Sequence, residues 1–358
     1  MQKKLIALAV AGLASTAAFA QSNVTIYGIM DASIDLVDIG DAGATNGRNE
    51  TQINSNASRI GFKGSEDLGN GLKAIFQIET AIGADGTSLS AGSNNSRNTY
   101  VGLAGSWGQV LLGQYDTPYK TSTRKLDLFA DHLGDTRNLM GWGGVTGFDI
   151  RQANTVRYDS PDMNGFAVSA AYAATSEGAN AVSGTQNDRL ISLSGTYTNG
   201  PWYGALAYQK NELGSGTGAT AGDDERAWKL GVGYTQDVWH VGFAYENIDD
   251  NYAVPGSSME HDAWTLGGSY TAGSNVFKLA YTEVDDTNNV SDTGAKQWAI
   301  GVDHILSKRT KLYAEYVKLS NDSAAAYTLN GAGTTATAGV AGLDADPSAF
   351  SFGIKHSF

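Results

Sequence analysis

The charged side chains of residues 116–152 are the part of this sequence best suited to act on other molecules. The interval shows no strand-like alternation. It mixes two sets of charges, Lys120, Arg124, Lys125, Arg137 and Arg151 against Asp116, Asp127, Asp131, Asp135 and Asp149. Fixed charges of both signs create a local field that can attract or orient ions and dipolar molecules. A connection this long usually has a function or is disordered. The mixed charges, a helix-compatible patch around Leu126–His132 and the later glycines predict a folded insertion.

Covalent chemistry finds less support in the sequence. The chain has no cysteine, and therefore no thiolate nucleophile and no disulfide. No Gly-x-Ser-x-Gly motif and no His-x-x-x-His pair accompanies the five candidate bases, His132, His240, His261, His304 and His356. An enzyme is therefore the alternative class, and no cofactor is expected. The acidic pairs Asp223-Asp224, Asp249-Asp250 and Asp285-Asp286 either hold divalent cations through their oxygens or are ordinary solvated loop charges.

Residues 1–20 have the pattern of a secretory signal peptide. Lys3 and Lys4 precede an apolar run that ends at Ala18-Phe19-Ala20, a small-x-small cleavage site. No other apolar run approaches the ~20 residues that a transmembrane helix needs. Removing two lysines makes the mature chain, 21–358, about two charges more negative than the −13 of the full sequence. This acidity argues against nucleic acid as a partner.

From Asn23 onward the dominant period is two. In the first segment apolar residues such as Ile26 and Ile34 alternate with polar ones such as Thr25 and Asp35, which predicts a strand with two different faces. Similar segments give sixteen predicted strands, at 23–37, 58–66, 71–83, 96–105, 108–116, 153–160, 164–175, 187–198, 201–212, 225–236, 238–249, 261–272, 274–285, 294–305, 309–320 and 348–358.

The connections between these strands alternate between short and long. The short ones are 65–71, 105–108, 161–165, 198–201, 236–238, 272–275 and 306–309. The long ones are 38–57, 84–95, 116–152, 176–186, 213–224, 250–260, 286–293 and 321–347. Strict alternation collects all long loops on one side of the molecule. Short turns on one side, long loops on the other and an even strand count are typical of outer-membrane barrels.

Aromatic residues occur at both ends of the apolar faces. Trp202 and Trp239 follow short turns, whereas Trp228, Trp264 and Trp298 lie just inside strands entered from long loops. Two aromatic rows flanking an apolar band are typical of a surface that faces lipid. The last strand must pair with the first, because lipid tolerates no open sheet edge. The sequence therefore predicts an all-β, 16-stranded antiparallel transmembrane β-barrel around a wet interior.

Five stretches carry a family resemblance: QSNVTIYGIMDASID, SRIGFKGSEDLGNGLKAIFQIE, RNTYVGLAGSWGQVLLGQYDTPY, NTVRYDSP and the ending FSFGIKHSF. Together they resemble the general porins of Gram-negative bacteria, most closely the neisserial and β-proteobacterial type. The resemblance covers the mature chain. It implies a trimer of sixteen-stranded barrels in which the third outer loop folds inward and narrows the channel. The interval 116–152 corresponds to that loop, with GWGGVTGF where some porins have a Pro-Glu-Phe-Gly turn.

The same resemblance implies which charges face each other at the narrowing. Wall arginines oppose loop acids, and the matching residues are Arg59, Arg97 and Arg157 against Asp116, Asp127, Asp131 and Asp135. Alternation puts Arg59 and Arg157 on the polar strand face, whereas Arg97 has the same parity as the apolar Val101 and Leu103. The alternative to a role in the channel is that each arginine is a surface charge or part of a strand-end salt bridge, and that each acid is a helix cap or a loop charge.

The function implied is passive diffusion of ions and small hydrophilic solutes across the outer membrane, without catalysis. A substrate-selective channel and an adhesin also stay open, although the loop segments 213–222 and 324–342 are low in complexity. Expected partners are two further copies in a homotrimer, outer-membrane lipid and lipopolysaccharide, and the barrel assembly machinery, for which Phe358 is the family's terminal signal. The acidic chain favours cations and the wall arginines favour anions, so the ion preference stays open.

Overall fold

The computed structural model describes residues 23–40, 49–84, 97–141, 147–174, 189–212, 224–249, 260–288, 290–329 and 343–358. The signal peptide predicted at 1–20 lies outside these residues, as do the acids Asp223 and Asp250. Among the described residues, no helix is both long and apolar enough to cross a membrane. The same residues contain no group of three or more His, Asp and Glu side chains arranged to hold a metal ion.

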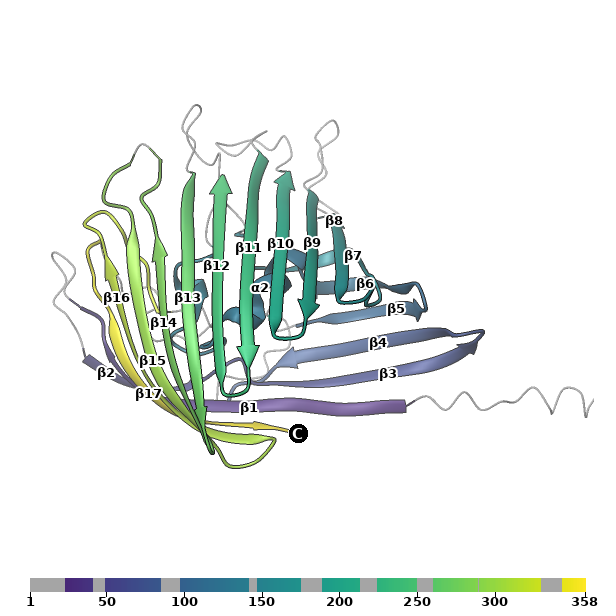
Figure 1. The fold of residues 1–358 in the computed structure, drawn as a ribbon, viewed down its shortest axis with the longest axis horizontal. Helices are drawn as coiled ribbons and strands as arrows, with labels where there is room; N and C mark the ends of the chain where they lie inside the picture. The colour runs from purple at the N-terminus through teal and green to yellow at the C-terminus, as the bar shows by residue number, and fades with distance from the viewer. Residues whose placement is uncertain are drawn as a thin grey trace, which may run out of the picture.

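The described chain forms one antiparallel sheet that closes on itself as a barrel (Figure 1). β1 pairs with both β2 and β3, each strand from β3 onward pairs with the next along the chain, and the last strand pairs with the first from Ile29↔Ser357 to Asp38↔Ser348. The strands are β1 Asn23–Asp38, β2 Asn49–Ser55, β3 Arg59–Gly69, β4 Leu72–Ala81, β5 Thr99–Gly105, β6 Gly108–Asp116, β7 Arg151–Asp159, β8 Phe166–Ala174, β9 Arg189–Asn199, β10 Trp202–Glu212, β11 Asp224–Gln236, β12 Trp239–Asp249, β13 His261–Ala272, β14 Asn275–Val284, β15 Ala295–Ile305, β16 Thr310–Asn321 and β17 Ser348–Ser357.

The predicted sixteen strands are confirmed, with one correction at the first long connection. The prediction made 38–57 a loop, but residues 49–55 form β2. This strand pairs with the C-terminal half of β1, and β3 pairs with the N-terminal half. β2 and β3 together occupy one position in the barrel, beside β1. Sequence alternation missed β2 because NETQINS contains one aliphatic residue, Ile53, too few to show a period.

A one-residue bulge separates β2 from β3. Ala32 pairs with Ser55 and Ile29 with Arg59, so three steps on β1 oppose four on its partner. Ala57 takes a φ of 53°, in the left-handed region, and the extra residue reverses which residues point inward. Ile53 and Arg59 are both odd-numbered, yet they lie on opposite faces of the sheet. Ile53 faces outward and is 65% exposed, whereas Arg59 faces the interior.

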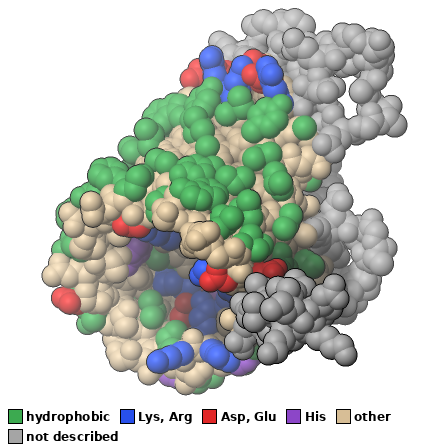
Figure 2. All heavy atoms as spheres, turned by 90° about the vertical axis from the view of Figure 1, so that its right-hand side faces the viewer, with side chains coloured by type: hydrophobic (Ala, Val, Ile, Leu, Met, Phe, Trp, Pro, Cys, Tyr) green, Lys and Arg blue, Asp and Glu red, His purple; other side chains and the backbone are tan. Residues whose placement is uncertain are grey.

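The barrel is apolar outside and polar inside, the reverse of a water-soluble protein. Along β11 the outward residues include Trp228, Leu230 and Val232, each 40% exposed, whereas the inward Lys229 is 1% exposed. Figure 2 shows the hydrophobic side chains spread over the outer surface, with charged side chains along one rim and in a hollow of the molecule. Lipid accepts exposed apolar side chains, and charges facing lipid at mid-membrane are destabilising. The exterior is therefore a lipid-facing surface.

Candidate functional site

The inserted loop between β6 and β7 lies inside the barrel and begins with a short helix. In this helix, α2 (Pro118–Thr123), proline takes the first turn and the Thr117 hydroxyl accepts a hydrogen bond from the Lys120 amide. Two 3₁₀ turns follow, at Arg124–Leu126 and Thr136–Asn138. The ends of the loop meet where the Thr117 amide donates to the Ile150 carbonyl at 3.1 Å. Residues 142–146 of the predicted GWGGVTGF segment lie outside the described residues.

A strip of small residues on the inner wall makes room for the loop. A Cβ added to Gly231 or Gly233 on β11 would lie 2.8 Å from Leu126, and one added to Gly301 on β15 would lie 2.9 Å from Phe129. The loop's apolar side chains pack there with alanines of β12 to β15 and are at most 3% exposed: Leu126, Phe129, Leu133, Leu139 and Met140. This small hydrophobic core fixes the loop to one side of the interior.

Buried polar contacts hold the loop to the wall near its start and at its middle. Tyr119 donates its hydroxyl proton to Glu246 Oε2 at 3.0 Å. In the middle of the loop His132 stacks on Tyr313 with ring centroids 4.2 Å apart, and its Nε2 lies 3.0 Å from Asp31 Oδ2. Burial alone would lower the pKa of His132, but hydrogen bonds to Asp31 and Glu315 raise it. The contacts come from β12, β16 and β1, so the loop lies along this part of the wall.

The loop and the opposite wall enclose a charged space of about 480 Å³. Its lining contains seven basic residues, Arg59, Arg97, Lys120, Arg124, Arg137, Arg151 and Lys355, and three acidic ones, Glu79, Asp116 and Asp131. We call this space the waist. Figure 2 shows a hollow in which basic and acidic side chains lie together. The lining therefore carries more positive than negative charge.

The three wall arginines expected from the sequence have different surroundings. Arg59 and Arg97 both line the waist and share one acid, with Arg97 Nε 2.7 Å and Arg59 Nε 3.9 Å from the Glu79 carboxylate. Arg97 precedes β5, so strand alternation does not determine its direction. Arg157 lies outside the waist lining, where it pairs with Asp159 at 2.8 Å and donates to the Asp116 carbonyl at 2.5 Å.

Of the four acids expected to oppose them, only two line the waist. Asp131 is the acid closest to the wall arginines on the loop side, with its Oδ2 4.0 Å from Arg59 Nη1. Asp116 joins the two ends of the loop through Lys120 at 3.0 Å and Arg151 at 3.1 Å. The Asp127 and Asp135 side chains are 5% and 0% exposed, behind the waist surface.

The buried acids instead form a network with the loop's own arginines. Arg124 lies 2.6 Å from Asp131 and 3.0 Å from Asp135, and Arg137 lies 2.7 Å from Asp135. Burial alone would raise the pKa of Asp135, but Arg124 and Arg137 lower it far below its usual value. Burial and the neighbouring Asp135 raise the pKa of Asp127 to about 7. The network holds the two loop arginines at the surface of the waist.

Sequence reasoning missed much of the basic lining. Arg124, Arg137 and Arg151 are conspicuous in the loop, but a loop without periodicity gives no sign of which side chains face water. Lys355 and Glu79 could have been found, because each lies on the polar face of an alternating strand, in FGIKHSF and KAIFQIET. The expected arrangement, basic wall against acidic loop, is therefore replaced by a waist with basic residues on both sides.

The fold and the waist together define a class of protein: a water-filled transmembrane channel narrowed by one internal loop. Residues 7–324 match the model of the Gram-negative porin family. "Outer membrane porin protein 32" of Delftia acidovorans is 32% identical over 365 residues, covering 100% of both chains. "Major outer membrane protein P.IB" of Neisseria lactamica is 28% identical over 93% of this chain and 98% of that protein. The solved "Anion-selective porin from Comamonas acidovorans" has a TM-score of 0.78 and 29% identity, covering 94% of this chain and 100% of its own.

The chain belongs to the Gram-negative porin family. It is an outer-membrane porin, a channel through which small hydrophilic solutes diffuse passively. This confirms the family, the fold, the location and the general function that the sequence predicted.

Proposed function

We propose that this porin prefers anions, and that the waist residues Arg59, Arg97, Arg124, Arg137 and Lys355 determine the preference. The observation that carries the proposal is the lining of seven basic and three acidic side chains around about 480 Å³. A passing ion is within a few ångströms of these charges, where screening by salt is weakest.

The acidity of the whole chain does not oppose this preference. Its net charge is −13, but charges farther than about 8–10 Å from the ion path are screened at physiological salt. Within the loop, Asp127 and Asp135 are buried against Arg124, so they offer little negative surface to a passing ion. The local charge of the waist therefore decides the preference, and the similar Comamonas acidovorans protein is described as anion-selective.

The zero-current potential of single channels in a potassium chloride gradient tests the proposal. An anion preference gives a potential of the sign set by chloride, and its size falls as the salt concentration rises because the waist charges are screened. A potential of the opposite sign, at both low and high salt, would show that cations pass more easily and that the waist lining does not control selection.

We further propose the assembly that the family resemblance implies. The mature chain begins near Gln21, passes to the barrel assembly machinery through its terminal Phe358, and forms a homotrimer in lipopolysaccharide-containing membrane, without a catalytic activity. A purified protein whose gel mobility changes on boiling, and whose sedimentation in detergent corresponds to three chains, would support the trimer. A single chain in sedimentation would contradict it.

A further inference from the structure

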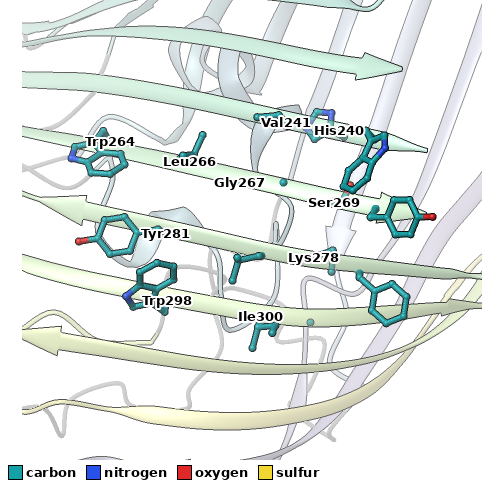
Figure 3. Close-up of a pocket in the computed structure, with 16 residues that line it drawn as sticks. His240, Val241, Trp264, Leu266, Gly267, Ser269, Lys278, Tyr281, Trp298 and Ile300 are labelled. Carbon is teal, nitrogen blue, oxygen red and sulfur yellow. The ribbon is translucent and has the colours of Figure 1, made fainter. Parts of the chain in front are cut away.

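A second hollow lies on the outside of the barrel, away from the waist. It has a volume of about 820 Å³, within the range of ligand pockets, and extends over β12 to β15. The side chains that project into it are apolar and face lipid, among them Val241, Leu266, Leu279 and Ile300, each 46–56% exposed. We call this hollow the outer groove (Figure 3).

A missing side chain creates the floor of the outer groove. Gly268 pairs with Val241 on one side and Leu279 on the other, both of which face lipid, so Gly268 faces lipid too. A Cβ added there would meet nothing closer than the His240 carbonyl oxygen at 3.6 Å. The sheet surface is therefore notched in the middle of the apolar band, where the neighbouring strands carry branched side chains.

Aromatic rings bound the outer groove at both ends. At the end near the long loops, Trp264, Tyr281 and Trp298 are in contact, with ring centroids 5.2 and 4.6 Å apart. Figure 3 shows their nitrogen and oxygen atoms directed away from the groove. At the end near the short turns, Trp239 and Tyr270 lie 4.4 Å apart. Such rows mark the two membrane interfaces, so the groove extends across the hydrocarbon layer between them.

Basic side chains lie beside and just beyond the aromatic row at the long-loop end of the groove. Lys318 pairs across strands with Trp298 and is exposed, and the structure gives it no ion-pair partner among the described residues. Lys296 lies two residues before Trp298 on the same face; it is 55% exposed and 3.6 Å from Glu283. Two ammonium groups above an apolar channel match a lipid that carries a phosphate on its head group and acyl chains below it.

We propose that the outer groove binds one outer-leaflet phosphoglycolipid, with an acyl chain over Gly268 and a phosphate between Lys296 and Lys318. Burial of each methylene contributes to binding, and the two lysines orient the head group. The short-turn end of the groove has basic residues too, Lys308 and Arg309, but they lie in the turn beyond β15 and not beside the ring that bounds the groove. The outer leaflet is therefore the source of the lipid.

Native mass spectrometry of the intact protein in mild detergent tests this proposal. The probes are diphosphorylated lipid A, the same lipid without phosphates, and phosphatidylglycerol. Gly268→Phe fills the groove, and Lys296→Gln with Lys318→Gln removes the head-group contacts. We expect each change to weaken binding of diphosphorylated lipid A at least about tenfold, because each removes one of the two contacts that define the site. The lysine variant should bind both lipid A forms equally.

Matched controls separate the site from general lipid contact. Gly204→Phe adds the same ring to another lipid-facing glycine, on β10, where an added Cβ meets nothing within 4 Å. Lys308→Gln with Arg309→Gln removes two charges at the opposite interface. Both controls should bind like the unchanged protein, and single-channel conductance verifies that every variant folds. Equal losses in Gly204→Phe and Gly268→Phe, or a loss that follows Lys308 and Arg309 instead of Lys296 and Lys318, would overturn the proposal.

Discussion

Arg59 and Asp131 are opposite charges in the waist lining that approach each other from the wall and the loop, at 4.0 Å. Neither residue is paired with the other alone. Arg59 is also 3.9 Å from Glu79, and Asp131 also contacts Arg124 and Arg137 at 2.6 and 3.1 Å. Shared partners leave part of each charge directed at the water of the waist. Single substitutions here change the charge that a passing ion meets while leaving the network around the site largely intact.

Removing Arg59 and Arg97 together is expected to shift selection toward cations. A unit charge about 4 Å away in water is worth about 1 kcal/mol, so Arg59→Gln with Arg97→Gln should raise the cation-to-anion permeability ratio by a factor of about 3 to 10. The measurement is the zero-current potential in a salt gradient. Arg157→Gln is the matched wall control, because Arg157 pairs with Asp159 outside the waist lining. An equal shift in the control would show that position in the wall is unimportant.

The loop acids should divide into one that selects ions and one that does not. Asp131→Asn removes a negative charge from the waist surface and is expected to strengthen the anion preference about twofold to fivefold. Asp127→Asn should leave the potential unchanged, since the Asp127 side chain is 5% exposed and faces Arg124. Both variants are compared under identical salt gradients. A comparable change in the two would mean that buried loop charge also reaches the ion path.

Asp127 should also make stability depend on pH. Its pKa is raised from 3.8 to about 7 by burial and by Asp135, so the folded loop binds a proton more tightly than the unfolded chain does. The contribution of Asp127 protonation to the free energy of unfolding is complete below about pH 4. It falls by at most about 1.4 kcal/mol per pH unit until about pH 7. Asp135, whose pKa is lowered, acts in the opposite sense but only at acidic pH, below 3.8. Asp127→Asn mimics the protonated form and should raise the melting temperature at pH 8 but not at pH 4. Equal effects at both pH values would contradict the assignment.

The extent to which residues could be predicted follows from periodicity. Arg59 and Arg157 lie on strands, so their inward direction could be predicted from their neighbours. Arg97 precedes its strand, and its parity pointed the wrong way. Within the loop, the sequence shows the sign of each charge but not whether the side chain is buried. The burial of Asp127 and Asp135 depends on a hydrophobic core shared with the distant strands β12 to β15, which no local pattern contains.

At the scale of elements, the inserted loop depends on the small residues of the wall behind it. Gly231 is the clearest case, because an added Cβ would lie 2.8 Å from both Leu126 and Thr123. The cavity that each missing side chain leaves in the wall is filled by the loop, at the packing density of a protein interior. The position of the loop, and with it the width of the waist, is therefore encoded in the strand glycines as well as in the loop.

Enlarging Gly231 is expected to displace the loop toward the water. Gly231→Val should reduce single-channel conductance and increase current noise, because overpacking a filled interior typically costs about 1–3 kcal/mol and the loop is the side that can move. Planar-bilayer recordings measure both effects. Gly195→Val is the matched control, a lipid-facing glycine with nothing within 4 Å of an added Cβ. Unchanged conductance in Gly231→Val would show that the loop is not packed against β11.

The strands themselves were largely predictable, because a lipid-facing strand must alternate. In long strands such as β1 and β11, the alternation of apolar and polar residues extends over many positions and defines the two faces. The exception, β2, is short, polar and separated from β3 by the bulge at Ala57, so alternation fails at the point where the parity reverses. The alternating loop lengths predicted the topology more securely than any single strand, since seven short turns fix which strands are neighbours.

At the scale of the whole molecule, the terminal residue closes the barrel. The Phe358 amide and carbonyl exchange hydrogen bonds of 3.1 Å with Gly28, and a Cβ added at Gly28 would lie 2.4 Å from the Phe358 ring. The pair completes the seam between β17 and β1 at the end where the β1–β3 pairing begins. Glycine at position 28 makes room for the ring, and the ring covers the backbone edge.

Deleting Phe358 is expected to lower the amount of folded barrel in the membrane about tenfold or more, while channels that do form should conduct normally. The expectation combines the lost seam contacts with the recognition of the terminal aromatic that the family resemblance implies. Quantification of heat-modifiable protein in outer-membrane fractions, followed by single-channel recording, measures both parts. Phe350→Leu, a change on the lipid face of the same strand, is the control. Normal membrane levels of the deletion variant would refute this role of Phe358.

The position of the inserted loop in the chain also bears on the order in which the channel folds. It precedes in the chain almost everything that it packs against: the Leu133 amide bonds to Glu315, 182 residues later, and the Tyr119 hydroxyl to Glu246, 127 residues later. These partners lie on the wall strands β12 and β16, so this part of the wall must be ordered before the loop can pack against it. We expect the channel to exist briefly as a wide cylinder before the loop takes its position, so its selectivity is the last property it acquires. Recordings during insertion of refolding protein should show a large, weakly selective conductance that decreases once to the native level; native conductance from the first event would exclude such a stage.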